Sequence, residues 1–247
     1  MLELDAWLEI AKAAALRGGK YLLENQGTEL KILLNQGRDI KLQLDTDTEQ
    51  LIKDSLSSQS AFSILGEETG LSNDLGEFYW VVDPLDGTSN FLRNIPISCV
   101  SIALMQNVTP ILGVIYDFNH DDLYFGHLES KAFLNQIEIK VSDYSEKSQS
   151  TLVTGIPAKT NYSDNEFKHM IEDFQQWKKV RMIGSAAMAS IYIAAGKADT
   201  YKENGIFLWD IAAGAAIVNA AGGVASITNI QADYRVDALF TNQLLAS

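Results

Sequence analysis

Residues 80–91, WVVDPLDGTSNF, place two aspartates three residues apart at the end of an apolar run. The two valines are predicted to lie in a buried strand. Pro84 is expected to end that strand, because proline has no N–H to donate to a ladder. The carboxylates of Asp83 and Asp86 would then stand together at the edge of a sheet, beside a turn. Negative charge gathered where the core stops suggests a bound cation that neutralises it.

The turn that follows these aspartates suits a phosphate. Gly87 permits close approach of the backbone, and residues 87–90 can open a helix whose free N–H groups face an anion. Carboxylate oxygens beside such a turn suit Mg²⁺, which binds a few carboxylates together with water and substrate oxygens. An isolated pair of aspartates is more often part of a capped turn, so the hypothesis of a magnesium and phosphate site depends on other acidic segments.

The composition is typical of a soluble globular protein with an acidic surface. The chain has 247 residues, 47% of them hydrophobic, and a formal net charge of −13. This charge argues against binding to nucleic acid or to an anionic membrane, and a phosphate-bearing substrate then needs local neutralisation by cations. The single cysteine, Cys99, excludes an intramolecular disulfide. The acidic, amphipathic N-terminus lacks the features of a secretion signal, so a cytoplasmic enzyme or binding protein without a membrane span is expected.

The order of elements predicts an α/β chain with two halves, 1–145 and 146–247, packed as one compact unit. A helix with a weak point at its Gly18-Gly19 pair is expected over 4–25, followed by a loop rich in Asn, Gln and Gly and a second helix from near Asp45. Strands are predicted at 61–66, 78–83, 99–105, 109–116, 122–126, 151–154, 198–202, 224–228 and 239–241, and helices at 165–177, 185–195 and from Asp210.

Three further acidic positions are ambiguous when each is taken alone. Glu67, in GEE at 66–68, again puts an acid at the end of an apolar run, although such a pair is usually solvated surface. Asp210, in WDIAAG, stands at the start of an apolar helix, where an N-cap is the common explanation. Asp45 occupies a similar position at the start of the second predicted helix.

Taken in order, these segments resemble the inositol monophosphatase family of metal-dependent phosphomonoesterases. The resemblance rests on GEE at 66–68, WVVDPLDGTSNF at 80–91, VRMIGSAAM at 180–188 and YKENGIFLWDIAAG at 201–214, and it spans nearly the whole chain. It implies a layered α-β-α-β-α sandwich of the α+β kind. It also implies two or three Mg²⁺ ions per site and a homodimer.

The resemblance assigns roles to particular residues. The implied metal ligands are Glu67, Asp83, the backbone carbonyl of Leu85, Asp86 and Asp210. The implied substrate contacts are Asp86, Gly87, Thr88, Ser185, Ala186, Glu203 and Asp210. Glu67 would anchor the metal that activates the attacking water, while Thr88 and Asp45 would pair, orient that water and accept its proton.

The match around this aspartate is imperfect. The family usually shows a Val-Thr pair upstream, whereas this chain has DIKLQLDTDTE at 39–49. Asp45 is preferred to Asp47 because Glu49 then falls four residues later, as in the family.

The substrate stays open. Ser89-Asn90 and the AAM sequence at 186–188 resemble the inositol phosphatase branch, so an inositol monophosphate is expected. Glu203 can accept hydrogen bonds from a polyol or an amine, which leaves histidinol phosphate, fructose 1,6-bisphosphate and a 3′(2′),5′-bisphosphate nucleotide as alternatives. The competing class is a non-catalytic binding protein on the same fold. The cost of burying so many acids without a metal speaks against it.

Overall fold

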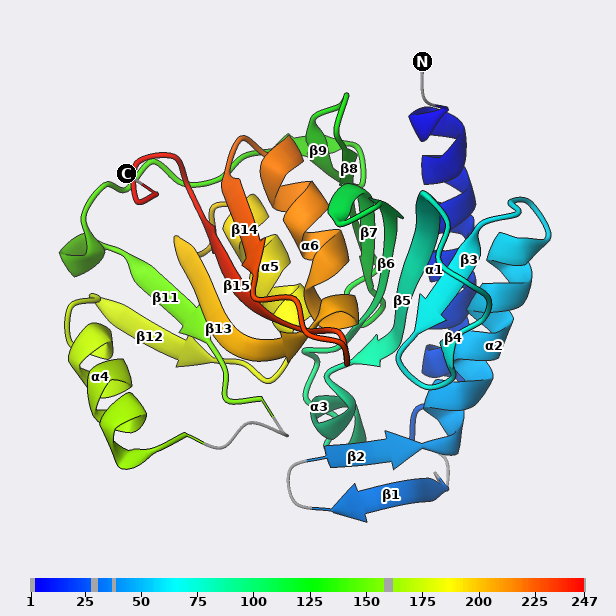
Figure 1. Ribbon diagram of the computed structural model, residues 1–247, viewed down its shortest axis with the longest axis horizontal. Helices are drawn as coiled ribbons and strands as arrows, with labels where there is room; N and C mark the ends of the chain where they lie inside the picture. Colours follow the sequence, from blue (N-terminus) through cyan, green and yellow to red (C-terminus); the bar gives the residue numbers. More distant parts are fainter. Residues whose placement is uncertain (1–2, 28–30, 37–38, 158–161, 247) are drawn as a thin grey trace.

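The computed structural model describes residues 3–27, 31–36, 39–157 and 162–246. Helices and sheets alternate in five layers (Figure 1), so the predicted α-β-α-β-α sandwich is confirmed. Helices α1 (Leu4–Asn25) and α2 (Gln43–Ser57) cover the outer face of a first sheet. Helices α5 (Ala186–Ala194) and α6 (Leu208–Ala220) lie between this sheet and a second one, beyond which α4 (Asp164–Phe174) forms the last layer.

The first sheet has eight strands and is mostly antiparallel. Across the sheet they are β10 (Ile137–Ile139), β9 (Ala132–Leu134), β8 (Asp122–His127), β7 (Thr109–Asp117), β6 (Cys99–Gln106), β5 (Phe78–Asp86), β3 (Ser63–Gly66) and β4 (Gly70–Leu71). Strands β3 and β5 are parallel neighbours, with Gly66 opposite Val82. Because parallel neighbours end at the same edge of a sheet, the acid that follows β3 and the acids in the last residues of β5 are brought together.

The second sheet has five strands: β12 (Lys179–Met182), β11 (Thr151–Thr154), β13 (Thr200–Phe207), β15 (Arg235–Thr241) and β14 (Val224–Thr228). The remaining elements are a hairpin of β1 (Ile32–Gln36) and β2 (Asp39–Leu42), the short helix α3 (Thr88–Leu92) and the 3₁₀ turn η1 (Lys147–Gln149). Helix α6 packs against both sheets, so the two parts of the chain share a layer. The division into halves at 145 stays a prediction.

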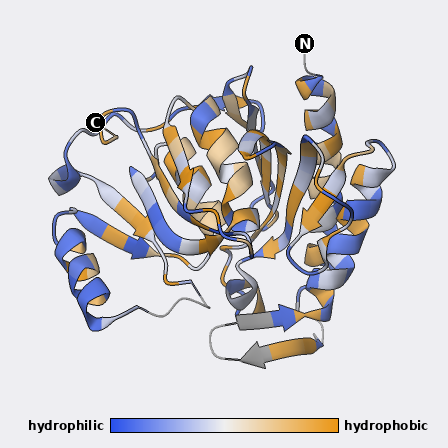
Figure 2. Ribbon diagram, viewed as in Figure 1, coloured by the Kyte–Doolittle hydropathy of each residue, from blue (hydrophilic) through white to orange (hydrophobic). Residues whose placement is uncertain are grey.

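Two clusters of buried apolar residues form the core. One buried cluster surrounds α5 and α6, and the other lies between the first sheet and the pair α1 and α2. Figure 2 shows α6 as mainly apolar and α4 as mainly hydrophilic, which agrees with the absence of any buried residue from α4. Within the described ranges, no helix is both long enough and apolar enough to cross a membrane.

The prediction that Pro84 ends its strand is wrong. Strand β5 continues to Asp86, and its pairing with β6 shifts register between Asp83 and Asp86. Such a bulge leaves residues out of the ladder, so the missing N–H of Pro84 costs no hydrogen bond there. The bulge places both aspartates within the end of a strand rather than in a following turn.

Two further expectations about the N-terminal segment are also wrong. Helix α1 continues without a break through the Gly18-Gly19 pair, and because a Cβ on Gly19 would lie 2.4 Å from the Tyr116 ring, this glycine permits close packing on β7. The described part of the predicted Asn-, Gln- and Gly-rich loop forms the paired strands β1 and β2 instead, whereas Gly37 lies outside the described residues. These short strands have no alternating apolar pattern that would distinguish them from a loop.

Candidate functional site

A cavity of about 310 Å³ opens at the carboxyl ends of β3 and β5. Its lining includes every predicted site residue except Asp45: Glu67, Asp83, Leu85, Asp86, Gly87, Thr88, Ser185, Ala186, Glu203 and Asp210. The fold thus brings both halves of the chain to one place. Among the described residues that line this cavity, none is a lysine, an arginine or a histidine, so its four acids from the metal prediction meet no basic side chain there.

Glu67 and Asp83 are neighbours in the cavity, at the ends of β3 and β5. The backbone N–H of Glu67 donates to the Val82 carbonyl at 3.1 Å, which fixes the acidic turn on β5. Asp83 is 1% exposed and accepts a 3.0 Å hydrogen bond from the Leu85 N–H. Burial, followed by repulsion from Glu68, raises the pKa of Glu67 to about 8. Burial and the neighbouring carboxylates raise the pKa of Asp83 well above its usual value.

Asp86 joins the two halves of the site. Its Oδ2 accepts hydrogen bonds from the Ser185 hydroxyl at 2.6 Å and from the Ala187 N–H at 2.7 Å. Ser185 is the N-cap of α5, and its hydroxyl oxygen also accepts from the Met188 N–H at 3.1 Å. Burial raises the pKa of Asp86 to about 6, although these hydrogen bonds oppose the rise.

Asp45 and Asp210 are held by the same local arrangement. Each is the third residue of its helix rather than the first, because α2 begins at Gln43 and α6 at Leu208. Asp45 accepts from the Leu42 N–H at 2.9 Å, and Asp210 accepts from the Phe207 N–H at 3.2 Å. One oxygen of each carboxylate thus caps its helix, and the second oxygen takes no part in that cap.

That second oxygen is unsatisfied in Asp45. The side chain is 3% exposed, and its Oδ1 is buried without a hydrogen-bond partner. Burial raises the pKa of Asp45 to about 7. For Asp210, burial and then repulsion from Asp86 and Glu67 raise the pKa well above its usual value. A buried carboxylate oxygen with no partner is a feature that a ligand or a proton would relieve.

The predicted hydrogen bond between Thr88 and Asp45 is absent. Thr88 Oγ1 donates instead to the Leu85 carbonyl at 3.1 Å, a local partner three residues earlier that requires no long-range approach. The turn before it needs glycine, since Gly87 has φ +91° and an added Cβ would lie 2.7 Å from the Ile97 carbonyl oxygen. The turn between Leu85 and Thr88 is therefore fixed by its own backbone.

Glu203, on β13, forms the opposite wall of the cavity. It is 7% exposed, and its Oε2 accepts a 3.0 Å hydrogen bond from the Tyr201 hydroxyl. Burial raises the pKa of Glu203 to about 7. Gly155, which follows β11, makes room for the Glu203 side chain, because a Cβ on Gly155 would lie 2.5 Å from Glu203 Oε2.

The donor set of this cavity suits a hard cation. It offers only oxygen ligands, and burial together with repulsion between carboxylates raises the pKa values of Glu67, Asp83 and Asp210, an effect that a bound cation would oppose. Within the described ranges, however, no three His, Cys, Asp or Glu side chains are arranged so that they could hold a metal ion. The carboxylates of Asp83, Asp86 and Asp210 instead turn toward N–H and O–H donors. The chemistry of the site fits Mg²⁺, and its ligation would need these carboxylates to turn.

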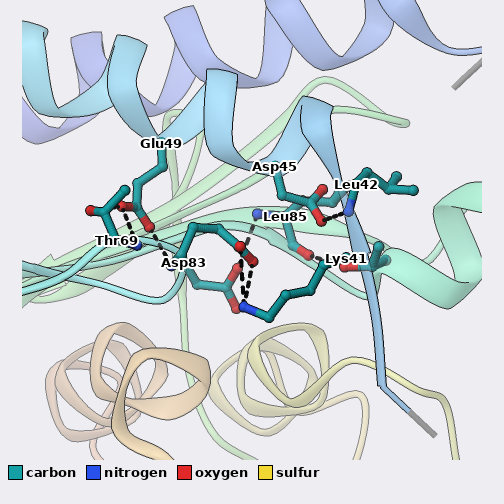
Figure 3. Close-up of polar contacts among 9 residues, drawn as sticks. Lys41, Leu42, Asp45, Glu49, Thr69, Asp83 and Leu85 are labelled. Carbon is teal, nitrogen blue, oxygen red and sulfur yellow. Dashed lines mark hydrogen bonds and ion pairs between the residues drawn. The ribbon is translucent and has the colours of Figure 1, made fainter. Parts of the chain in front are cut away.

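Sequence reasoning gave no role to two residues that support the site. Glu49, 0% exposed on α2, accepts hydrogen bonds from the Glu68 N–H at 2.8 Å and the Thr69 N–H at 3.1 Å, and also from the Thr69 hydroxyl. Figure 3 shows Glu49 and Asp45 reaching from α2 toward the strand ends. Their spacing of four residues, which places both on one face of a helix, was the signal for Glu49.

Asn90 is the second supporting residue. Its Nδ2 donates to the carbonyls of Ile97 and Ile183, both at 2.8 Å. It therefore ties α3 to the loop before α5, across 93 residues of sequence. An asparagine at this position is also typical of a turn, so the sequence gave no indication that Asn90 would bond to the Ile183 carbonyl.

Comparison with known proteins agrees with this geometry. The family model described as "Inositol monophosphatase family" matches residues 3–243. An inositol-1-monophosphatase of Synechocystis sp. is 35% identical over 91% of this chain and 79% of its own length. A Nus factor SuhB of Xylella fastidiosa is 36% identical over 87% of this chain and 80% of its own.

Solved structures give the same result. The structure of the inositol monophosphatase from Anabaena (Nostoc) sp. superposes with a TM-score of 0.84 at 35% identity, covering 99% of this chain and 93% of that one. The family match extends over the strand-end acids, the DGT turn and both helices that meet the cavity. By its sequence, its fold and the residues gathered at this cavity, the chain belongs to the inositol monophosphatase family.

Proposed function

We propose that this protein hydrolyses a small phosphate monoester, an inositol monophosphate, in a reaction that depends on Mg²⁺. The observation that carries the proposal is a cavity in which Glu67, Asp83, Asp86 and Asp210 meet without a basic side chain among the described lining residues. Acids so withdrawn from water need cations to stay ionised, and a dianionic phosphate needs the same cations to enter.

Glu67, Asp83, Asp86, Asp210 and the Leu85 carbonyl would hold two or three Mg²⁺ ions. The ions would supply positive charge that polarises the phosphate, favours ionisation of the attacking water and stabilises the leaving oxygen. The N–H groups of Gly87 and Thr88, at the start of α3, would bind the phosphate. No side chain of the protein needs to act as a nucleophile.

The proton of the attacking water would pass to Asp45, with Thr88 orienting that water. Two features support Asp45: its Oδ1 has no partner, and its pKa of about 7 suits a general base near neutral pH. Thr88 would exchange its bond to the Leu85 carbonyl for one that orients the water. In this role the carboxylate keeps its helix-capping bond through Oδ2 while Oδ1 accepts the proton.

The opposite wall would position the alcohol part of the substrate. Ser185, Ala186 and Glu203 face the cavity, and Glu203 offers oxygens to hydroxyl groups of a polyol. The same oxygens would also accept from an amine, so histidinol phosphate, fructose 1,6-bisphosphate and a nucleotide bisphosphate stay as alternatives. The relatives described above carry the names of an inositol phosphatase and of a Nus factor. The net charge of −13 disfavours direct binding of this chain to nucleic acid.

We also propose a homodimer, which the resemblance to the family implies. Large apolar side chains stand exposed on α4 and β12: Ile171 at 50%, Phe167 at 39% and Met182 at 53%. Exposed apolar groups on neighbouring elements favour a protein contact. Light scattering at micromolar concentration measures the mass, and a value of 27.2 kDa for the particle would exclude a stable dimer.

The test of function is phosphate release with and without Mg²⁺. The substrates are inositol 1-phosphate, histidinol phosphate, fructose 1,6-bisphosphate and adenosine 3′,5′-bisphosphate. We expect Mg²⁺-dependent release, fastest from inositol 1-phosphate. Release from another member of the panel would keep the reaction and correct the substrate. No release from any of them, in a protein that binds Mg²⁺ by calorimetry, would favour the non-catalytic alternative.

A further inference from the structure

Lys41 carries a positive charge beside the acidic turn, just outside the residues that line the cavity. It lies near the end of β2, and its Nζ is 3.1 Å from both carboxylate oxygens of Glu68. The Glu68 side chain is only 6% exposed and that of Lys41 26%, so this ion pair is largely shielded from solvent. Figure 3 shows Lys41 extending from β2 toward Asp83, below Asp45.

The charge of Lys41 acts on more than its direct partner. It lowers the pKa of both Glu67 and Asp45, opposing burial and the repulsion from Glu68. It therefore faces acids from two elements, α2 and the turn after β3. The next lysine in this region, Lys53, lies 4.0 Å from Glu49 and donates to Thr69 Oγ1 at 2.7 Å, so its charge is directed to the supporting residues rather than to the cavity.

We propose that Lys41 is a fixed counter-ion of the acidic turn that weakens the binding of a divalent cation at Glu67. The inference rests on the proposed metal-dependent function and adds a residue that sets metal affinity. A cation held by Glu67 would bind one residue away from the carboxylate of Glu68, which holds the ammonium group of Lys41 by both oxygens. Like charges in such a shielded place repel much more strongly than in water.

The same pair has a second consequence for the hairpin. Lys41 is part of β2, and Glu68 is fixed by Glu49 through its backbone N–H at 2.8 Å. The ion pair thus ties the β1–β2 hairpin to the turn that carries Glu67. Lys41 is a positioning residue in this scheme: it acts on the metal through charge and touches neither substrate nor the reacting water.

The experiment is calorimetric titration of the chelator-treated full chain with Mg²⁺, comparing wild type with Lys41→Met. Methionine keeps an unbranched apolar stem out to Cε and removes the ammonium group with its charge. We expect Mg²⁺ to bind about tenfold more tightly to Lys41→Met. Lys41→Arg keeps the charge and the two-point contact with Glu68, so its affinity should return to that of wild type.

A matched control is Lys131→Met. Lys131 also contacts both oxygens of one glutamate, Glu138, at 2.8 and 2.7 Å, but on the β9–β10 hairpin and not at the acidic turn. Its loss should leave Mg²⁺ affinity unchanged, which separates a local effect from a change in net charge. Circular dichroism and the melting temperature show that each variant is folded, and Lys41→Arg provides the answer if Lys41→Met does not fold.

The outcomes separate this inference from the proposed function. Equal or weaker Mg²⁺ binding by Lys41→Met, in a wild-type chain that binds Mg²⁺ and releases phosphate, overturns the counter-ion role alone. Equal tightening in Lys131→Met also overturns it, because net charge then explains the effect. If Lys41→Arg binds Mg²⁺ as tightly as Lys41→Met does, the counter-ion role is also overturned, because arginine keeps the positive charge. A wild-type chain that binds no Mg²⁺ overturns both proposals together.

Discussion

The two walls of the cavity are built in different ways. Glu67, Asp83, Asp86 and Thr88 come from one stretch of 22 residues that begins after β3 and includes its parallel neighbour β5. Ser185, Glu203 and Asp210 come from three separate elements of the second half: the start of α5, strand β13 and the first turn of α6. The first wall is a local motif, whereas the second exists only because α5, α6 and the second sheet pack against the first.

The walls also differ in how their charges are satisfied. Burial, followed by repulsion from neighbouring carboxylates, raises the pKa of both Glu67 and Asp83. On the other wall, Glu203 has a hydroxyl partner in Tyr201, and Ser185 donates to Asp86. This difference suggests that changes in the first wall act on metal binding and rate. Changes in the second should act mainly on the choice of substrate.

The largest expected effect is that of Asp86→Asn, which changes the residue that joins the walls. Asparagine can still accept from the Ala187 N–H but loses the charge, so Mg²⁺-dependent turnover should fall by about a thousandfold, or about 4 kcal/mol. Circular dichroism should show an intact fold. The matched variant is Asp199→Asn, a 5% exposed aspartate bonded to Ser142 and Thr151 outside the cavity. Near-normal turnover in Asp86→Asn would refute the metal scheme.

The second prediction concerns stability against pH when metals are removed by a chelator. The folded-state pKa is raised from 3.8 to about 7 in Asp45 and from 4.5 to about 8 in Glu67. The folded chain then binds more protons than the unfolded chain between these values. The free energy of unfolding should therefore be largest at the acid end and fall by about 4 kcal/mol for each of these two groups as pH rises to about 8.

Denaturant melts across this range measure the effect. Saturating Mg²⁺ should reduce the decline, because cations favour the ionised carboxylates of the folded state. Asp45→Asn should also reduce it, since one raised group is then lost. A free energy of unfolding that rises with pH in the metal-free protein would show that the first wall is not under strain from its own charges.

A smaller effect, on stability and on KM, is expected for Asn90→Ala, which breaks the contact between the walls. Two hydrogen bonds to the carbonyls of Ile97 and Ile183 are lost, which should cost about 2 kcal/mol of folding free energy and raise KM. The control is Asn119→Ala, whose Nδ2 bonds to the Ser98 carbonyl at 3.0 Å within the first half. Asn119→Ala should lose stability with little change in KM. Equal KM values for Asn90→Ala and Asn119→Ala would contradict the bridging role of Asn90.

The smallest effect is expected for Glu203→Gln. The amide still accepts the hydrogen bond of the Tyr201 hydroxyl but offers an N–H₂ group where a carboxylate oxygen was. The ratio of kcat/KM between inositol 1-phosphate and histidinol phosphate should change by about tenfold, while the Mg²⁺ concentration for half-maximal rate stays the same. If neither quantity changed, Glu203 would have no place among the substrate contacts.

Several features could be predicted from the sequence because they depend on neighbours in the chain. The acids at the ends of β3 and β5 follow apolar runs, and the structure places them around one cavity. Gly87 is required by its own φ of +91°. Helix α1 was predicted over its whole length, since its apolar positions recur with helical spacing. The second helix and α6 were each placed two residues late, because Asp45 and Asp210 cap from the third position.

Other features were decided only by the tertiary structure. Pro84 lies inside β5 because the register of β6 allows a bulge there, and Thr88 bonds to the Leu85 carbonyl rather than to Asp45. The Asp86–Ser185 bond spans 99 residues and the Lys41–Glu68 pair spans 27. The sequence by itself determined which oxygens the site contains, since motif and strand end are local. The packing of sheets and helices decided which donors, acids and counter-ion those oxygens meet, because long-range contacts depend on register and on the distance between layers.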